Sequence, residues 1–463
     1  MASGEANYRS LAWIAASALF MQSLDATILN TALPTIAADL HHSPLEMQLA
    51  VISYALTVAL FIPISGWVAD KYGTLRVFRF AVGMFALGSL ACAMSSSLIM
   101  LIFSRVLQGF GGALMMPVAR LSIIRSVPKQ ELLPVWNLMA TAGLTGPILG
   151  PILGGWIVTY TSWHWIFLIN IPMSLLGIWL ANRYMPNVTG SLQKLDWAGF
   201  FFLGGGLVGV TLGFDLISEE FIAKWQATVI VILGVILIIT YCFHAQKRER
   251  LALLPLSLFK IRTFRVGIMA NMLIRLCASG IPFLLPLMYQ VVFHYSADKA
   301  GMLIAPIALS SMLVKPLCGR ILTKLGYRTA LISASIVLTL SIAVMSFLHI
   351  DSPVWILIVN VALYGGCISI VFTAVNTLTI SELSDQDASA GSTFLSVVQQ
   401  VGIGLGIAVS ALILSLYRYF IGESAVQLQQ AFGYTYLTSA SFGVLLVLVL
   451  SGLKKEDGAH LHK

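Results

Sequence analysis

Two charged residues lie inside long apolar stretches, where their chemistry would allow a proton to be bound and released. Asp25 belongs to the apolar segment 24–34, and Arg105 opens the glycine-rich segment 105–113. An unpaired charge inside a membrane costs at least about 2.5–3.5 kcal/mol, so each side chain should face a cavity or a partner. At about 1.5 Å per helical residue the two lie at similar depth, and we expect Asp25 to be the proton-binding carboxylate, with Arg105 favouring its ionised form when close. The alternative is a structural ion pair that never titrates.

The polar segment 66–73 carries the next charged candidate. Gly66 and Gly73 favour a tight turn, and Asp70 lies between them. We expect Asp70 to cap the N-terminus of another helix or to pair with Arg120, and so to act as a conformational latch between two halves of the molecule. A solvated turn with a local ion pair is the alternative.

Small residues recur every four positions in the segment 146–155, which also contains prolines. Such a face lets helices approach closely, and proline kinks the helix that carries it. We expect the segment to close the two halves against leakage, whereas packing without gating is the alternative. The residues of this motif are Gly146, Gly150, Pro151, Gly154 and Gly155.

Polar and aromatic side chains at other apolar positions are candidates for binding a small molecule. Arg275 lies near the middle of its apolar stretch, where its charge cannot easily reach the interface, so we expect it to contact an anion or a carboxylate. Each of the others is as well suited to a hydrogen bond between helices. The candidates are Gln22, Tyr54, Gln108, Arg275, Tyr289, Asn376, Gln399 and Gln400.

Membrane-spanning helices are the elements expected to position these residues. Of 463 residues, 58% are hydrophobic and only 10% are charged, which excludes an ordinary soluble globular protein. A hydrocarbon core of about 30 Å needs about 20 apolar residues per crossing. The predicted fold is an all-α polytopic membrane protein with fourteen transmembrane helices, at residues 10–33, 47–69, 77–97, 99–124, 133–159, 164–184, 197–217, 226–244, 263–290, 297–319, 329–348, 353–378, 388–417 and 432–452.

The net charge of +8 is explained by membrane topology without a nucleic-acid partner. With the N-terminus inside, nearly all cations outside the apolar stretches fall on the same side, and only Lys224, Lys299 and Arg418 fall on the other. The positive-inside rule expects this distribution. We therefore expect a multi-pass protein of the bacterial inner membrane with both termini in the cytoplasm.

Two parts of the chain resemble each other. The loop 66–73 has a weaker counterpart 253 residues further on, at 319–326, and at nearly the same spacing Gln108-Gly109 corresponds to Gly365-Gly366. Chance similarity between apolar segments is the alternative to a repeat. We expect two six-helix bundles, 1–190 and 263–463, and an inserted two-helix linker with a basic segment at 191–262. Transporters built from two parallel repeats bind substrate between them, near the midplane.

No cofactor, metal or enzymatic site is predicted. The five cysteines lie in apolar stretches without a CxxC pair, and no clustered His, Asp or Ser constellation is present. A GxxxxGK[ST] loop for ATP is also missing. The expected partners are a small-molecule substrate, protons and the lipid bilayer, and any uphill transport would draw on an ion gradient.

Four of these segments, 24–34, 66–76, 105–113 and 146–155, resemble in order the signatures of the fourteen-helix drug:proton antiporters of the EmrB/QacA type, in the major facilitator superfamily. Segment 20–34 most resembles the HsrA/MdtD-like branch. The resemblance implies Asp25 as coupling carboxylate, Arg105 as proton-relay arginine, Asp70 as loop latch and Gly150-Pro151 as the antiporter kink. Thr323 stands where the second loop would need an aspartate, which puts a second latch in doubt.

The expected function is proton-coupled efflux of amphipathic drugs or toxic small molecules by alternating access. The alternatives are a narrow-specificity transporter of a metabolite such as an amino acid or a siderophore, and a membrane sensor that does not transport. The sequence leaves open whether a periplasmic adaptor and an outer-membrane channel join the protein.

Overall fold

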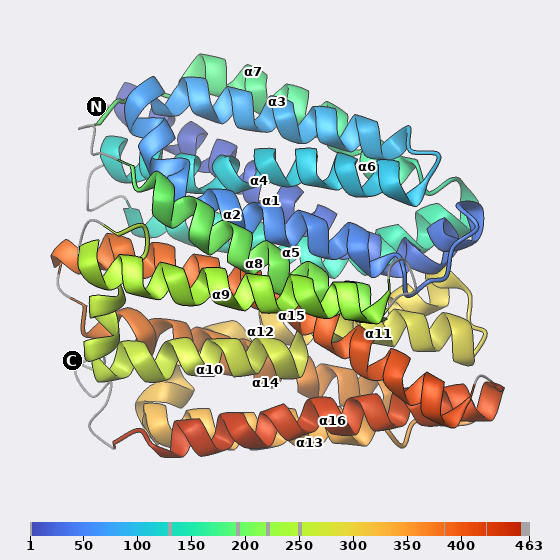
Figure 1. The fold of residues 1–463 in the computed structure, drawn as a ribbon. Helices are drawn as coiled ribbons and strands as arrows, with labels where there is room; N and C mark the ends of the chain where they lie inside the picture. Colours follow the sequence, from blue (N-terminus) through green and yellow to red (C-terminus); the bar gives the residue numbers. More distant parts are fainter. Residues whose placement is uncertain are drawn as a thin grey trace. The chain divides into compact units, whose positions relative to one another are not determined.

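The computed structural model describes residues 2–127, 132–190, 195–218, 223–248, 252–383, 385–422 and 424–454, and nearly all of them are helical (Figure 1). No strand occurs among these residues. The elements are α1 (Ala2–Asp39), α2 (Gln48–Tyr72), α3 (Thr74–Ala93), α4 (Leu98–Ser126), α5 (Leu132–Tyr160), α6 (Trp165–Leu168), α7 (Asn170–Tyr184), α8 (Trp197–Ser218), α9 (Lys224–Arg248), the 3-10 helix η3 (Leu256–Lys260), α10 (Arg262–Ala278), α11 (Ile281–Leu287), the π-helix η4 (Met288–Val292), α12 (Ala297–Leu325), α13 (Tyr327–Met345), α14 (Val354–Ser381), α15 (Asp385–Ile421) and α16 (Ala425–Ser451).

These helices confirm the predicted all-α membrane fold. Within the described residues, 13 helical segments are long and apolar enough to cross a membrane. Two of them combine shorter elements: α6 and α7 form the segment Trp165–Tyr184, and α10, α11 and η4 form the segment Arg262–Val291. The 29-residue helix α5 covers the remaining predicted span, 133–159.

The chain divides into two compact units. Unit 1 contains Met1–Leu195 and Ser296–Gly301, and unit 2 contains Asp196–Tyr295 and Met302–Lys463. The inserted pair α8 and α9 belongs to unit 2, where α8 packs against both α9 and α15. The division into two six-helix bundles and a separate two-helix linker remains a proposal.

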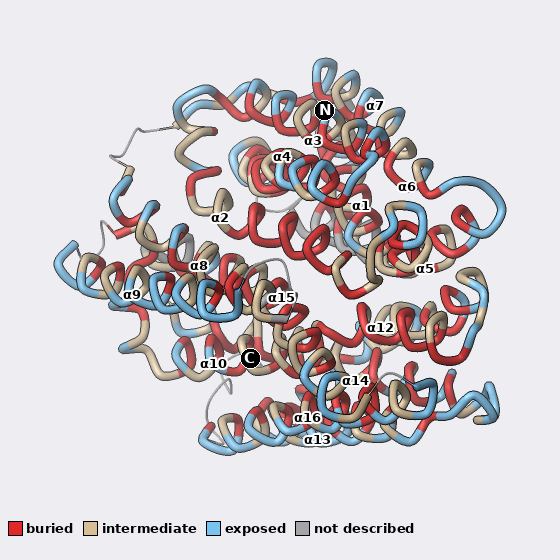
Figure 2. Tube along the Cα trace, turned by 45° about the vertical axis from the view of Figure 1, so that its right-hand side comes forward, coloured by how far each residue is buried: buried red, intermediate tan, exposed pale blue. Residues whose placement is uncertain are grey.

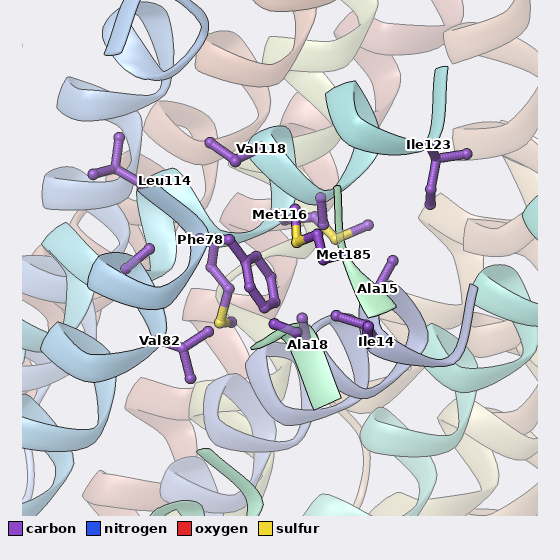
Figure 3. Packing of buried hydrophobic residues seen from close by; sticks show 14 of the residues in the cluster. Ile14, Ala15, Ala18, Phe78, Val82, Leu114, Met116, Val118, Ile123 and Met185 are labelled. Atoms are coloured by element: carbon purple, nitrogen blue, oxygen red, sulfur yellow. The ribbon is translucent and has the colours of Figure 1, made fainter. Parts of the chain in front are cut away.

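Unit 1 is built around α4, which contacts α1, α2 and α3. Small side chains of α1, such as Ala15 and Ala18, let the larger Phe78 of α3 and Met116 of α4 meet in a closed apolar core (Figure 3). Glycines bring α3 and α4 closer still, because a methyl group added at Gly88 would lie only 2.4 Å from the Gln108 backbone nitrogen. This close approach places polar residues of the two helices within hydrogen-bonding distance.

Unit 2 packs α10 against α14, α15 and α16. Its apolar core includes Ile274 of α10, Val371 and Val375 of α14, and Leu446 of α16. The outward faces are apolar too, and Figure 2 shows α9 exposed along much of its length, whereas α2 in unit 1 is mostly buried. Large exposed apolar faces are expected where a protein faces lipid.

Backbone geometry supports the internal repeat. Gly73 between α2 and α3 and Gly326 between α12 and α13 both have positive φ, of 90° and 77°. His41 and His294 also have positive φ, of 58° and 55°, which is uncommon for a residue other than glycine. The members of each pair are 253 residues apart in the chain, the same spacing as the loop motifs. Equivalent positions in the two halves therefore adopt the same unusual turn.

Candidate functional site

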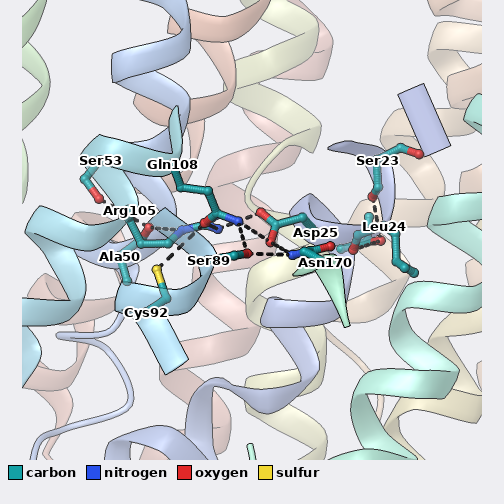
Figure 4. A network of polar contacts seen from close by, with 11 residues as sticks. Ser23, Leu24, Asp25, Ala50, Ser53, Ser89, Cys92, Arg105, Gln108 and Asn170 are labelled. Carbon is teal, nitrogen blue, oxygen red and sulfur yellow. Dashed lines mark hydrogen bonds and ion pairs between the residues drawn. The ribbon is translucent and has the colours of Figure 1, made fainter. Parts of the chain in front are cut away.

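Asp25 of α1 and Arg105 of α4 form a buried ion pair in unit 1 (Figure 4). The Arg105 Nη1 atom lies 2.6 Å from the Asp25 Oδ2 atom, and each residue is only 1% exposed. Burying two charges is expensive unless geometry and additional hydrogen bonds compensate for the lost water. The surroundings of both groups provide such hydrogen bonds.

Arg105 is held by α2 as well as by α1. Its Nε atom donates to the Ala50 carbonyl oxygen at 3.1 Å, and its Nη1 atom also donates to the Gln108 Oε1 atom at 2.6 Å. The guanidinium carbon lies 4.3 Å from the centre of the Tyr54 ring, a favourable position for a cation over an aromatic face. The guanidinium plane is therefore fixed by three partners besides Asp25.

The second carboxylate oxygen of Asp25 accepts two amide hydrogen bonds. Gln108 donates from Nε2 at 2.8 Å, and Asn170 of α7 donates from Nδ2 at 3.0 Å. Both amide groups also donate to the Ser89 hydroxyl of α3, each at 2.9 Å. Because Gln108, Asn170 and Ser89 are themselves buried, one network joins α1, α3, α4 and α7 around a single carboxylate (Figure 4).

Three side chains of this network were not among the predicted site residues: Ser89, Asn170 and Cys92. The Cys92 Sγ atom lies 3.8 Å from the Gln108 Oε1 atom. Each is a small polar residue in an apolar stretch, and Asn170 is flanked by two isoleucines. That isolation is the sequence signal that marks them, but it does not say which helix they face.

Tyr54 and Gln22 lie close to the pair in different ways. Tyr54 is 6% exposed and provides the ring under Arg105. Its hydroxyl occupies space left free by Gly112, where an added methyl group would lie 2.8 Å from the hydroxyl oxygen. Gln22 is half-buried on α1, three residues before Asp25.

The loop between α2 and α3 differs from the prediction. Asp70 pairs with Arg125, with 2.6 Å between Oδ1 and Nη2, and not with Arg120, which is exposed on α4. Five residues turn a helix by about 140°, so the two arginines point in different directions. Both partners belong to unit 1, so this pair does not join the two units. The predicted latch must be corrected in both respects.

Asp70 does not cap α3 either. The Asn187 Oδ1 atom accepts hydrogen bonds from the backbone nitrogens of Leu75 and Arg76, at 3.1 and 3.4 Å, in the first turn of α3. The segment that follows α7 also approaches Asp70 directly, since the Gly190 nitrogen donates to its carbonyl oxygen at 3.2 Å. Gly73 provides the positive φ of the turn, whereas Gly66 has open space around it.

The glycine-proline segment of α5 packs mainly against α1. Methyl groups added at Gly146, Gly150 and Gly154 would lie 2.1–2.4 Å from atoms of Ser23, Thr27 and Ile28. At the end of this face, Gly155 contacts the backbone at Ala297 and Asp298, and Gly301 contacts the Pro151 carbonyl oxygen. All these contacts are within unit 1, so they establish close helix packing, and gating remains a proposal.

The candidates in unit 2 lie on α10, α14, α15 and η4. Asn376 of α14 accepts a hydrogen bond from Gln399 of α15 at 3.0 Å, and Gln400 is half-buried beside it. Arg275 of α10 stacks on Phe372, with 4.2 Å from the guanidinium carbon to the ring centre. Tyr289 is fully buried and stacks on Phe293, so it is a core residue.

Among the described residues, no three His, Cys, Asp or Glu side chains are grouped so as to hold a metal ion. The polar network therefore consists of one carboxylate, one guanidinium and neutral hydrogen-bonding groups. Within this network, no nucleophile and base are arranged so as to break a covalent bond.

The fold and this site are those of a polytopic membrane protein with a buried ion pair inside its helices. The family model "Major Facilitator Superfamily" matches residues 15–407, and the chain belongs to that family. A Haemophilus influenzae relative named as the transport protein HsrA is 58% identical over 456 residues, covering 98% of each chain. A Pectobacterium atrosepticum relative named as the multidrug resistance protein MdtD is 37% identical, covering 96% of each.

Two solved structures show the same fold at low sequence identity. The D-xylose-proton symporter matches with a TM-score of 0.70 and 12% identity, covering 96% of this chain and 97% of that one. The nucleoside transporter NupG matches with a TM-score of 0.66 and 14% identity, covering 97% and 100%.

Proposed function

We propose that this protein is a proton-coupled antiporter that exports amphipathic small molecules across the bacterial inner membrane. The observation that carries the proposal is the buried Asp25, whose ion-pair partner among the described residues is Arg105. Intramembrane ionisable groups are expensive and typically mark proton or substrate pathways. The MdtD relative, whose name refers to multidrug resistance, supports drugs as the cargo.

Protonation of Asp25 is the step that links the proton to conformation. A proton on the carboxylate removes the counter-charge of Arg105, and a buried guanidinium without that charge favours a rearrangement that hydrates it or gives it a new partner. Release of the proton on the other side restores the pair. One proton crossing 100 mV provides about 2.3 kcal/mol, and each pH unit adds about 1.4 kcal/mol.

Membrane orientation follows from the distribution of cations. We place both termini in the cytoplasm because the loops assigned to that side carry nearly all the lysine and arginine residues outside the spans. In this orientation the Asp70–Arg125 pair lies at the cytoplasmic end of α2, where it would steady the α2–α3 loop while the inner side is closed.

A narrow-specificity metabolite exporter is the second candidate. The Haemophilus influenzae relative, at 58% identity, is named only as a transport protein, without reference to drugs. Competition by many unrelated compounds for export of one labelled substrate supports broad efflux. Competition by close analogues alone supports a single metabolite.

The decisive experiment uses purified protein in liposomes with an imposed pH gradient and a panel of labelled amphipathic compounds. We expect uphill movement of some compounds, accompanied by proton flux, and no uphill movement by Asp25→Asn. Exchange without a gradient is the control for folding of that variant. A variant at Asp25 that still concentrates cargo, or wild-type protein with no substrate-dependent proton flux, contradicts the proposal. Transport by this chain alone would also show that no adaptor or outer-membrane channel is needed.

A further inference from the structure

Arg275 is a cation inside a predicted span, and no counter-ion for it is found among the described residues. Its guanidinium lies against the Phe372 ring, its buried Nε atom has no hydrogen-bond partner, and it forms no ion pair with any described residue. Arg105 in unit 1 differs from Arg275 in this respect, because the charge of Arg105 is balanced by Asp25. An uncompensated charge at this depth costs at least about 2.5–3.5 kcal/mol, so Arg275 needs water or a ligand near it.

Lipid headgroups are too far away to supply the missing anion. Arg275 is 13 residues from Arg262 and 16 from Val291, the ends of its membrane segment. At about 1.5 Å per residue these separations are about 20 Å and 24 Å along the helix. The guanidinium is therefore held near the middle of the segment, beyond the reach of a phosphate at either surface.

Neighbouring helices hold Arg275 in a defined position. Gly402 of α15 leaves room for the arginine stem, because a methyl group added there would lie 2.7 Å from the Arg275 Cγ atom. One turn further along α10, the Tyr364 hydroxyl of α14 donates to the Ala278 carbonyl oxygen at 2.8 Å. The residue as a whole is half-buried, and its Nε atom is buried.

Amide groups extend the polar surface beside this arginine. Asn376 lies one turn after Phe372 on the same face of α14, and Gln399 lies nearly one turn before Gly402 on α15. Gln399 donates to Asn376 at 3.0 Å, and both are half-buried like Arg275. Three helices of unit 2 thus bring one unpaired guanidinium and two amides to neighbouring turns.

The second half has no carboxylate at the position equivalent to Asp25. At the spacing of 253 residues that relates His41 to His294, Arg275 corresponds to Gln22, and Asp25 corresponds to Ala278. The two halves therefore differ in charge at equivalent positions of their first spans. The first span of unit 1 carries a charge-balanced aspartate, whereas the equivalent span of unit 2 carries Arg275, which has no ion-pair partner among the described residues.

We propose that Arg275, together with the Asn376–Gln399 pair, binds a negatively charged group of the cargo, so that the protein prefers amphipathic carboxylates. This inference rests on the proposed function, because the bound compound is a transported substrate only if the protein is an exporter. The binding itself requires no proton gradient. A guanidinium donates two parallel hydrogen bonds to a carboxylate, and an uncharged amide of the same shape offers no charge to balance.

Binding to detergent-purified protein tests the site with matched acid and amide probes: 1-naphthoate and 1-naphthamide, decanoate and decanamide, and benzoate and benzamide. Titration calorimetry should show, for at least one pair, an acid that binds at least about 10-fold more tightly than its amide. Arg275→Gln should reduce this ratio to about 1 with little change in amide binding, and Arg275→Lys should retain part of the preference. Arg320→Gln, which removes an exposed guanidinium from α12, should leave the ratio unchanged.

Several results would overturn the proposal. These are the absence of any acid preference in the wild-type protein, an acid preference that survives Arg275→Gln, and an equal loss of acid and amide binding in that variant. Proton-coupled transport is measured separately in liposomes. Charge-selective binding without proton coupling would reject the proposed antiport and leave the anion site standing, whereas proton-coupled export without charge selectivity would do the reverse.

Discussion

Asn170 donates from one side-chain amide to both the Asp25 carboxylate, at 3.0 Å, and the Ser89 hydroxyl, at 2.9 Å. It is the first residue of α7, and it connects the last helix of the N-terminal six to the first and the third. A buried carboxylate oxygen that receives two amide hydrogen bonds is held in one orientation, and the position of Asp25 therefore depends on a residue that carries no charge.

Replacing Asn170 should lower both the stability of the protein and the rate of proton-driven export. Asn170→Leu deprives the Asp25 Oδ1 atom of one donor in a buried site, so we expect a loss of about 1–3 kcal/mol in unfolding free energy and a several-fold slower uphill export. Denaturant unfolding in detergent and liposome transport measure the two effects. Ser174→Ala is the matched control, because Ser174 is buried on the same helix and its hydroxyl donates to the Met21 sulfur at 3.3 Å, not to Asp25. Equal behaviour of the two variants would contradict the assigned role.

Because α5 packs closely on α1, an added methyl group should lower the stability of the protein at Gly150 but not at Gly66. Gly150→Ala should cost about 1–3 kcal/mol, because the new carbon would lie 2.1 Å from the Thr27 Oγ1 atom and 3.0 Å from the Ile28 backbone nitrogen. Gly66→Ala should be tolerated, since a methyl group there meets nothing within 4 Å. Melting temperatures of the two purified variants provide the comparison, and a stable Gly150→Ala protein would show that the helices separate easily.

The Asp70–Arg125 pair should affect turnover more than stability. Both side chains are about a quarter exposed, and an ion pair at that exposure contributes about 0–1 kcal/mol. We expect Arg125→Gln and Asp70→Asn to lower the rate of export several-fold while substrate affinity changes little. Arg120→Gln, in which the lost cation has no part in the pair, should retain the wild-type rate. If Arg120→Gln instead impairs export as strongly, the pairing with Arg125 is not the functional one.

Asp196 gives a pH-dependent contribution to stability at the start of α8. Burial raises the pKa of Asp196, but hydrogen bonds from His244 and from the backbone nitrogens of Gly199 and Leu253 outweigh it, and the net pKa lies below its ordinary value. A depressed folded-state pKa stabilises the protein above the unfolded value of about 3.9, and this stabilisation is lost as the pH falls further.

The measurement is the difference in unfolding midpoint between wild-type protein and Asp196→Asn. We expect a clear difference at pH 7 that shrinks as the pH falls below about 4. Asp351→Asn, at an exposed position outside the helices, should show little difference at either pH. A difference for Asp196→Asn that does not change with pH would mean that its charge is not what stabilises the start of α8.

Part of the site could be predicted from residue types alone. Asp25 and Arg105 interrupt apolar stretches, and the cost of a charge in a membrane is enough to predict that they need each other or a cavity. The partner of Asp70 was predicted wrongly, because Arg120 and Arg125 are equally plausible along the sequence. Only the helical phase of α4 and the path of the segment after α7 decide between them.

The sequence by itself determined the membrane fold, the approximate ends of the helices and the two intramembrane charges, because the length of an apolar stretch and the cost of burying a charge are local properties. Only the tertiary structure decided that Ser89 and Asn170 complete the network around Asp25, and that Arg275 has no counter-ion among the described residues. Those facts depend on which helix faces meet, and the small residues that set the contacts, such as Gly88 and Gly402, carry no chemical group that reveals their neighbours.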